Sequence, residues 1–168
     1  MAHSDSPRMY ALTSYDDYMC LKPPLLLWVA VLFLSRAITL PFAMGIGQVA
    51  GVSADALSAM RGLWSGDIAL VPSLIAVVLL YAFFRRVPSA SRQVRWIWAH
   101  GVAFIAVSAG ADLVLSLNSV IRTTEIGDPL LFSSLNAAAD GYFLLYIFVA
   151  RRVRDTFSEF PPPDTVAV

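Results

Sequence analysis

Four long apolar segments occupy most of this chain, and they restrict it to folds that a lipid bilayer can accommodate. They cover residues 24–49, 68–84, 96–119 and 130–150. A helix of about 20 apolar residues crosses the hydrocarbon core of a bilayer, and backbone groups inside that core must be satisfied within the protein. The sequence therefore predicts an all-α, polytopic membrane protein with four transmembrane helices.

The composition agrees with a membrane protein and excludes other classes. Hydrophobic residues make up 58% of the 168 residues and charged residues only 14%, whereas soluble domains average about 25% charged residues. The formal net charge of zero gives no electrostatic basis for binding nucleic acid. The single cysteine, Cys20, excludes an intramolecular disulfide and a multi-cysteine metal site.

Basic residues are distributed unevenly between the two sides of the predicted bundle. One side carries nine of them, at positions 8, 22, 85, 86, 92, 95, 151, 152 and 154, and the other carries Arg61 and Arg122. Basic loops remain in the cytoplasm, so both termini are expected there. A role in setting the membrane topology is sufficient to explain the arginine clusters. The alternative interpretation is that they bind anionic lipid.

The chain is expected to divide into three parts. Residues 1–23 form a cytoplasmic juxtamembrane arm, residues 24–150 the four-helix transmembrane domain, and residues 151–168 a cytoplasmic tail. Pro41 interrupts the first span. Since proline cannot donate a backbone hydrogen bond, we expect it to kink the first helix or to end it at Leu40.

Arg36, Asp112 and Asp140 are charged residues inside the predicted spans, where an ionised side chain is costly without a partner. Arg36 lies roughly 18 Å beyond Pro24 along a helix, just past the middle of a bilayer core of about 30 Å. Asp140 lies roughly 15 Å beyond Leu130, which enters from the opposite side. Similar depth predicts an Arg36–Asp140 ion pair, with Asp112 as a second partner.

Three polar residues lie one helical turn from the aspartates: Asn136 before Asp140, and Ser108 and Ser116 on either side of Asp112. Together with Arg36 they predict an internal polar network. One interpretation is a proton or ion path, and the other is a structural clip that fixes helix pairing. We favour the clip, because one guanidinium can serve both carboxylates and no further titratable groups continue across the span.

Motifs for catalysis or cofactor binding are missing from the sequence. It has no phosphate-binding glycine loop, no His-Glu-x-x-His, no Gly-x-Ser-x-Gly and no Cys-x-x-Cys. His100 is expected to be an interfacial or packed histidine, and a relay of protons toward Asp112 is the alternative. We therefore expect no enzyme activity, no catalytic residue, no cofactor and no metal.

A distinctive pattern runs through residues 15–28 as YDDYMCLKPPLLLW and continues through residues 32–36 as LFLSR. It resembles the opening of the YfeZ-like family of small bacterial inner-membrane proteins, a domain of unknown function, in which Arg36 occupies the position of an arginine that ends an apolar run. The resemblance extends to about Arg152. It implies a multi-pass protein of the bacterial inner membrane and supplies no activity, cofactor or catalytic residue.

Three functions are compatible with these features. The first is a non-enzymatic accessory or assembly subunit of a larger inner-membrane complex, with the lipid bilayer and other integral membrane subunits as partners and a homo-oligomer left open. The alternative is a small oligomeric proton-coupled transporter or channel that uses Asp112 and Asp140. A weaker third is a membrane enzyme that acts on lipid.

Overall fold

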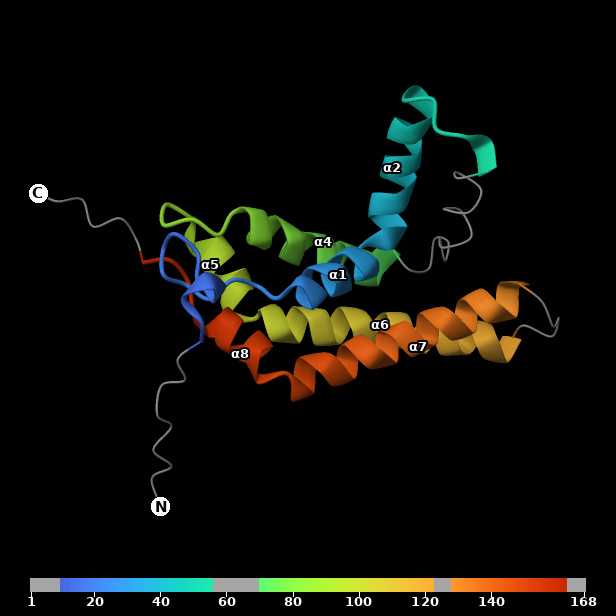
Figure 1. The fold of residues 1–168 in the computed structure, drawn as a ribbon. Coiled ribbons are helices and arrows are strands. Elements are labelled where there is room, and N and C mark those ends of the chain that lie inside the picture. The colour runs from blue at the N-terminus through green and yellow to red at the C-terminus, as the bar shows by residue number, and fades with distance from the viewer. Residues whose placement is uncertain (1–9, 56–69, 123–127, 163–168) are drawn as a thin grey trace, which may run out of the picture.

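The computed structural model describes residues 10–55, 70–122 and 128–162, and this part of the chain is all-helical (Figure 1). Its extended pairing is limited to an isolated bridge between Tyr15 and Leu21. The helices are a 3-10 turn (Leu12–Ser14), α1 (Leu25–Leu34), α2 (Arg36–Val49), α4 (Leu70–Phe84), α5 (Arg92–Ala99), α6 (Gly101–Arg122), α7 (Asp128–Val149) and α8 (Arg151–Ser158). The prediction of an all-helical chain is confirmed.

Two of the described helices are long and apolar enough to cross a membrane, α6 and the part of α7 from Leu130 to Val149. The consecutive helices α1 and α2 count as a third span only if the broken pair is taken together. α4 is apolar but has 15 residues, about 22 Å of helix, and residues 68–69 of the predicted second span lie outside the described residues. The described chain therefore contains two or three helices of spanning length, as expected of a membrane protein.

The helices pack side by side around one apolar core. α6 and α7 form an antiparallel hairpin, α4 lies against α6, and α1 lies against α4 (Figure 1). Small residues at the contacts, such as Ala109 of α6 and Ala137 of α7, allow the helix backbones to approach closely. The core is built from α1, α4, α5, α6, α7 and α8, and it includes Leu27, Val31, Leu34, Leu79, Phe83, Trp98, Ile105, Ile147, Val153 and Phe157.

The first predicted span is broken at Ser35 and not at Pro41. α1 ends at Leu34, α2 begins at Arg36, and the two axes meet at 84°. Pro41 lies inside α2, which continues past it to Val49. Of the two alternatives at Pro41, the one in which the helix ends at Leu40 is therefore wrong. Proline removes only one backbone donor, and the neighbouring turns keep their hydrogen bonds. α2 consequently projects from the side of the bundle (Figure 1).

The third predicted span, expected over residues 96–119, is also divided. His100 separates the short amphipathic helix α5 from α6. Gly101 starts α6 directly against the ring of Phe157 in α8, and a Cβ at position 101 would collide with that ring. Glycine is therefore required at this close approach between α6 and α8.

The two ends of the described chain meet at one end of the bundle. The segment before α1 lies beside α5 and α8 there (Figure 1), and the hydroxyl of Tyr10 donates to Asp155 Oδ2 at 2.5 Å. Residues 1–9 and 163–168 of the expected arm and tail lie outside the described residues. The described parts of both are packed against the bundle, so they form a folded end layer.

Candidate functional site

Arg36 and Asp112 form a buried ion pair next to the break between α1 and α2. Arg36 Nη1 lies 2.7 Å from Asp112 Oδ2, and the two side chains are 5% and 3% exposed. The sequence favoured Asp140 as the partner, but no described ion pair joins Arg36 to Asp140. The depth estimate assumed a straight helix, whereas the 84° bend lies between α1 and Arg36, so depth along the helix does not identify the partner.

Side chains satisfy the carbonyls that the break leaves without helical donors. Leu32 O accepts from the Oγ of Ser35 at 3.0 Å, and Phe33 O accepts from Nη1 of Arg36 at 3.1 Å. Leu34 O accepts from the Oγ of Ser73, which reaches across from α4 at 2.8 Å. Non-helical backbone is tolerated within a membrane only when such partners are present, so the bend is built into the fold.

The guanidinium of Arg36 is only partly satisfied. It lies over the ring of Phe33, 4.1 Å from the ring centre, a favourable contact for a cation. Its Nε and Nη2 atoms are buried and make no hydrogen bond within the described residues. The N–H groups of Nε and Nη2 are therefore unused hydrogen-bond donors beside Asp112 within the described residues.

Asp140 of α7 belongs to the same cluster. Its side chain is fully buried, and its Oδ2 accepts from the Oγ of Ser116 at 3.4 Å. Asp140 Oδ1 is buried and has no hydrogen-bond partner among the described residues. Asp140 also lies close enough to Asp112 and Arg36 to interact electrostatically with both. Arg36, Asp112, Ser116 and Asp140 are the buried charge cluster, in which two carboxyls face one guanidinium.

Two of the predicted network residues lie apart from this cluster. Ser108 is fully buried, and its Oγ donates to the carbonyl of Pro72 at 2.8 Å, so it joins α6 to α4. Asn136 is half-buried, and none of the hydrogen bonds between described residues joins it to Asp140. The predicted network is therefore reduced to the four residues of the buried charge cluster, and within the described residues it does not continue as a polar path.

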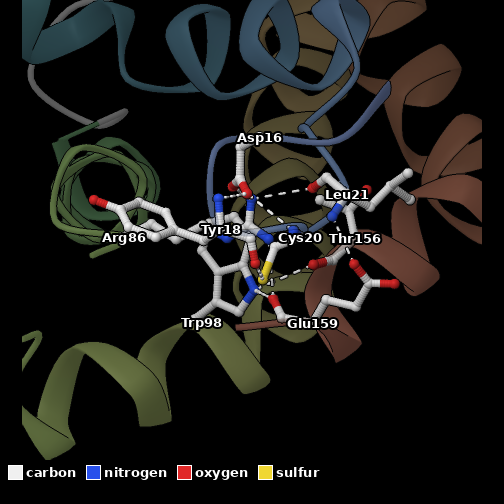
Figure 2. A network of polar contacts seen from close by, with 8 residues as sticks. All are labelled: Asp16, Tyr18, Cys20, Leu21, Arg86, Trp98, Thr156 and Glu159. Atoms are coloured by element: carbon white, nitrogen blue, oxygen red, sulfur yellow. Dashed lines mark hydrogen bonds and ion pairs between the residues drawn. The ribbon is translucent and has the colours of Figure 1, made fainter. Parts of the chain in front are cut away.

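A second polar centre lies at the end of the bundle where the chain ends meet, and Figure 2 shows it. Arg86 is buried and donates to Leu21 O at 3.0 Å and to Glu159 O at 3.2 Å. It also lies 3.4 Å from Asp16 Oδ2 and stacks over the ring of Trp98. We call these residues, Asp16, Leu21, Arg86, Trp98 and Glu159, the Arg86 hub.

The other contacts of the hub tie the arm to α8. Leu21 N donates to Glu159 Oε2 at 2.6 Å, and Trp98 Nε1 donates to the carbonyl of Glu159 at 2.9 Å. Asp16 Oδ1 accepts from the backbone N–H of Cys20 at 2.9 Å. The arm, the start of the loop after α4, α5 and the end of α8 are therefore held by one buried arginine.

Burial within the hub shifts two pKa values. Desolvation raises the pKa of the Cys20 thiol, with the charge of Arg86 opposing the shift. Desolvation also lowers the pKa of the Arg86 guanidinium, and the charge of Asp16 opposes that shift. Cys20 is 6% exposed, so the folded protein shields this thiol from solvent and disfavours its ionised form.

Sequence reasoning assigned Arg86 to topology and missed the hub. Arg86 donates two hydrogen bonds to backbone carbonyls. Every residue has a backbone carbonyl, so no pattern of side chains in the sequence indicates which ones Arg86 contacts. Asp16, Cys20 and Leu21 do occur within the pattern YDDYMCLK at residues 15–22. That pattern was the available signal that the arm packs against the protein.

The described residues contain no group of three or more His, Cys, Asp or Glu side chains that is suited to hold a metal ion. The buried charge cluster offers only two carboxyls, and the guanidinium cation of Arg36 already interacts with them. The arrangement can hold helices together or exchange a proton.

Comparisons with known proteins identify a family whose model matches most of the chain. The model of a family described as "Protein of unknown function (DUF2919)" matches residues 10–159. No curated protein matches the chain, and no solved structure matches it. The matched range includes both the buried charge cluster and the Arg86 hub.

Proposed function

The chain belongs to this family of proteins of unknown function, DUF2919, and we propose that it is a non-enzymatic accessory or assembly subunit of a larger membrane complex. The proposal includes a YfeZ-like, multi-pass protein of the bacterial inner membrane with four transmembrane helices and cytoplasmic termini. The asymmetry of the basic residues supports this orientation. The partners are the bilayer and other integral membrane subunits.

The projecting helix α2 is the observation that carries the proposal. It leaves the bundle at 84° and exposes Phe42, Ile46 and Val49, which are 73%, 57% and 91% exposed. Gly45, between them, has open space around it, and small residues allow another helix to approach. Because side chains of α1, α2 and α4 stabilise the bend, α2 is held in place for a partner helix.

The buried charge cluster fits a structural role in such a subunit. The ion pair between Arg36 and Asp112 joins α2 to α6. The hydrogen bond from Ser116 to Asp140 joins α6 to α7. A pair of this kind contributes to the choice of helix partners more than to net stability. In this proposal the cluster fixes the base of α2 against the hairpin of α6 and α7.

Extraction of the tagged full-length protein from native membranes in mild detergent tests the proposal. Mass spectrometry of the intact complex should show foreign subunits in fixed stoichiometry. Replacing Phe42 and Ile46 with alanine should release the foreign subunits. Replacing Leu145 and Phe148 of α7 with alanine should not release them, although these residues are 63% and 62% exposed. A complex without foreign subunits would overturn the proposal.

A second candidate function is a proton-coupled transporter or channel, and Asp140 favours it. Its Oδ1 is buried without a hydrogen-bond partner in the described chain, beside an ion pair at a broken helix. Transporters place ion and substrate sites at such breaks. Asp140→Asn would then abolish flux in reconstituted vesicles while the protein remains folded in the membrane, and unchanged flux would exclude this function.

A further inference from the structure

A groove of about 540 Å³ lies where α4, α5 and α6 meet. This corner is at the end of the bundle where the chain ends come together (Figure 1). Its lining comes from three helices and comprises Val78 of α4, Arg92, Gln93, Trp96 and Ile97 of α5, and Phe104 of α6. The groove thus combines an apolar wall with one cationic residue.

The apolar wall is continuous across the three helices. Val78 is 39% exposed and Trp96 is 56% exposed, and the rings of Trp96 and Phe104 lie edge to face with their centres 6.0 Å apart. Val78 precedes the last residue of α4, Phe84, by roughly 9 Å of helix. The wall therefore lies on the outer surface of the three helices, where an acyl chain of the bilayer can contact it.

Arg92 differs from Arg86, which is buried, and from Arg95, which is half-buried. Arg86 is engaged in the hub, and Arg95 donates to the carbonyls of Pro88 and Pro161 and stacks over Phe160. The side chain of Arg92 is exposed and makes no hydrogen bond or ion pair with any other described residue. It is therefore available to an external anion, whereas Arg86 and Arg95 serve the fold.

We propose that this groove binds one anionic phospholipid. Arg92 pairs with the headgroup phosphate, and an acyl chain lies along Val78, Ile97 and Phe104. Trp96 occupies the headgroup level, where tryptophan is enriched in membrane proteins. Charge complementarity selects this occupant, because a groove with a free cation at a membrane surface attracts anionic lipid. The site needs only that the protein lies in a bilayer, so it is independent of the proposed role as an accessory subunit.

Fluorescence quenching by lipids with brominated acyl chains tests the site on the purified full-length protein in detergent. Brominated phosphatidylglycerol should quench a saturable part of the tryptophan emission, and brominated phosphatidylcholine should require a much higher concentration. The variant Trp96→Phe should lose this part of the response, which places the bound chain beside Trp96. Equal quenching by the two lipids, or none by either, would overturn the proposal.

Two arginine variants separate the groove from general surface charge. Arg92→Gln should weaken phosphatidylglycerol binding about fivefold, the contribution of one arginine near a membrane surface. Arg85→Gln is the matched control, because Arg85 is also exposed in the same region and does not line the groove. Equal weakening by both variants would show a diffuse electrostatic attraction and would contradict a site at Arg92.

Ile97→Phe gives a second, steric test that adds no tryptophan. A larger side chain at position 97 should fill the apolar part of the groove and reduce phosphatidylglycerol quenching while Arg92 remains in place. Unchanged lipid affinity in a folded Ile97→Phe protein would exclude an acyl chain from this wall.

Discussion

Gly101 at the start of α6 lies directly against the aromatic ring of Phe157 in α8. Phe157 is 4% exposed and its ring also contacts Trp98 and Phe83. This aromatic group fills the space between α5, α6 and α8, so it cannot move aside for a side chain at position 101. The contact fixes how the last helix packs on the bundle.

Gly101→Ala should therefore destabilise the protein by about 1–3 kcal/mol, the usual cost of overpacking a core. Gly110→Ala is the matched control in the same helix, because a Cβ at position 110 meets nothing within 4 Å. That control should be neutral or slightly stabilising, since alanine favours a helix by up to about 1 kcal/mol over glycine. Thermal unfolding of both variants in detergent measures the difference, and equal unfolding temperatures would contradict the contact.

Arg36→Gln should destabilise the protein by about 3–5 kcal/mol, because it leaves the buried carboxyl of Asp112 without its cation. Adding Asp112→Asn should recover part of that loss, since neither charge then remains buried alone. Adding Asp140→Asn should recover less, because Asp140 is bonded to Ser116 and makes no described ion pair with Arg36. A double-mutant cycle measured by thermal unfolding gives the two coupling energies. A larger coupling to Asp140 would contradict the observed pairing.

Arg86→Gln should open the hub and expose Cys20. Hydrogen bonds to a charged group contribute about 1.5–3 kcal/mol, so losing them should speed the reaction of Cys20 with a maleimide about tenfold or more. The chain has one cysteine, so the labelling rate reports this position alone. Arg85→Gln should leave the rate unchanged, because Arg85 is exposed at the surface. Equal rates in the Arg86 variant and the unmodified protein would show that the arm is held without Arg86.

The raised pKa of Cys20 predicts a loss of stability at alkaline pH. A thiol in the unfolded chain ionises near pH 8.5, whereas burial keeps the folded thiol protonated to a higher pH. The stabilising contribution is therefore complete below about pH 8.5 and is lost as pH rises through the folded pKa. Unfolding free energies from pH 7 to pH 10 should fall less steeply in Cys20→Ala. Identical pH profiles would show that Cys20 does not contribute.

The part of the fold that can be predicted from the sequence follows from the lipid bilayer around the apolar segments. Apolar segments of this length must satisfy their own backbone in a bilayer, so the hairpin of α6 and α7 was visible as residues 96–119 and 130–150. The ends differ by a few residues because Gly101 must meet Phe157, which lies more than fifty positions later. Local periodicity contains no information about such a partner.

The break at Ser35 could not be predicted for the same reason. Its geometry depends on Ser73 and Asp112, which lie on other helices, whereas Pro41 was a local signal and pointed to the wrong turn. The sequence predicts a polar network that contains the four residues of the buried charge cluster, because charged residues in apolar spans need partners. These residues are Arg36, Asp112, Ser116 and Asp140. Which carboxyl pairs with Arg36 depends on tertiary packing.

The arm before α1 contacts residues that lie far along the chain, with Leu21 bonded to Glu159 across 138 positions. During synthesis the arm is made before α1, and its binding partners at the end of α8 emerge only after the helices between them have been made. The hub therefore cannot close on a partly translated chain, and closing contacts this distant in sequence is slow. A nascent chain would keep Cys20 reactive until α8 docks, so thiol protection would mark the completion of folding.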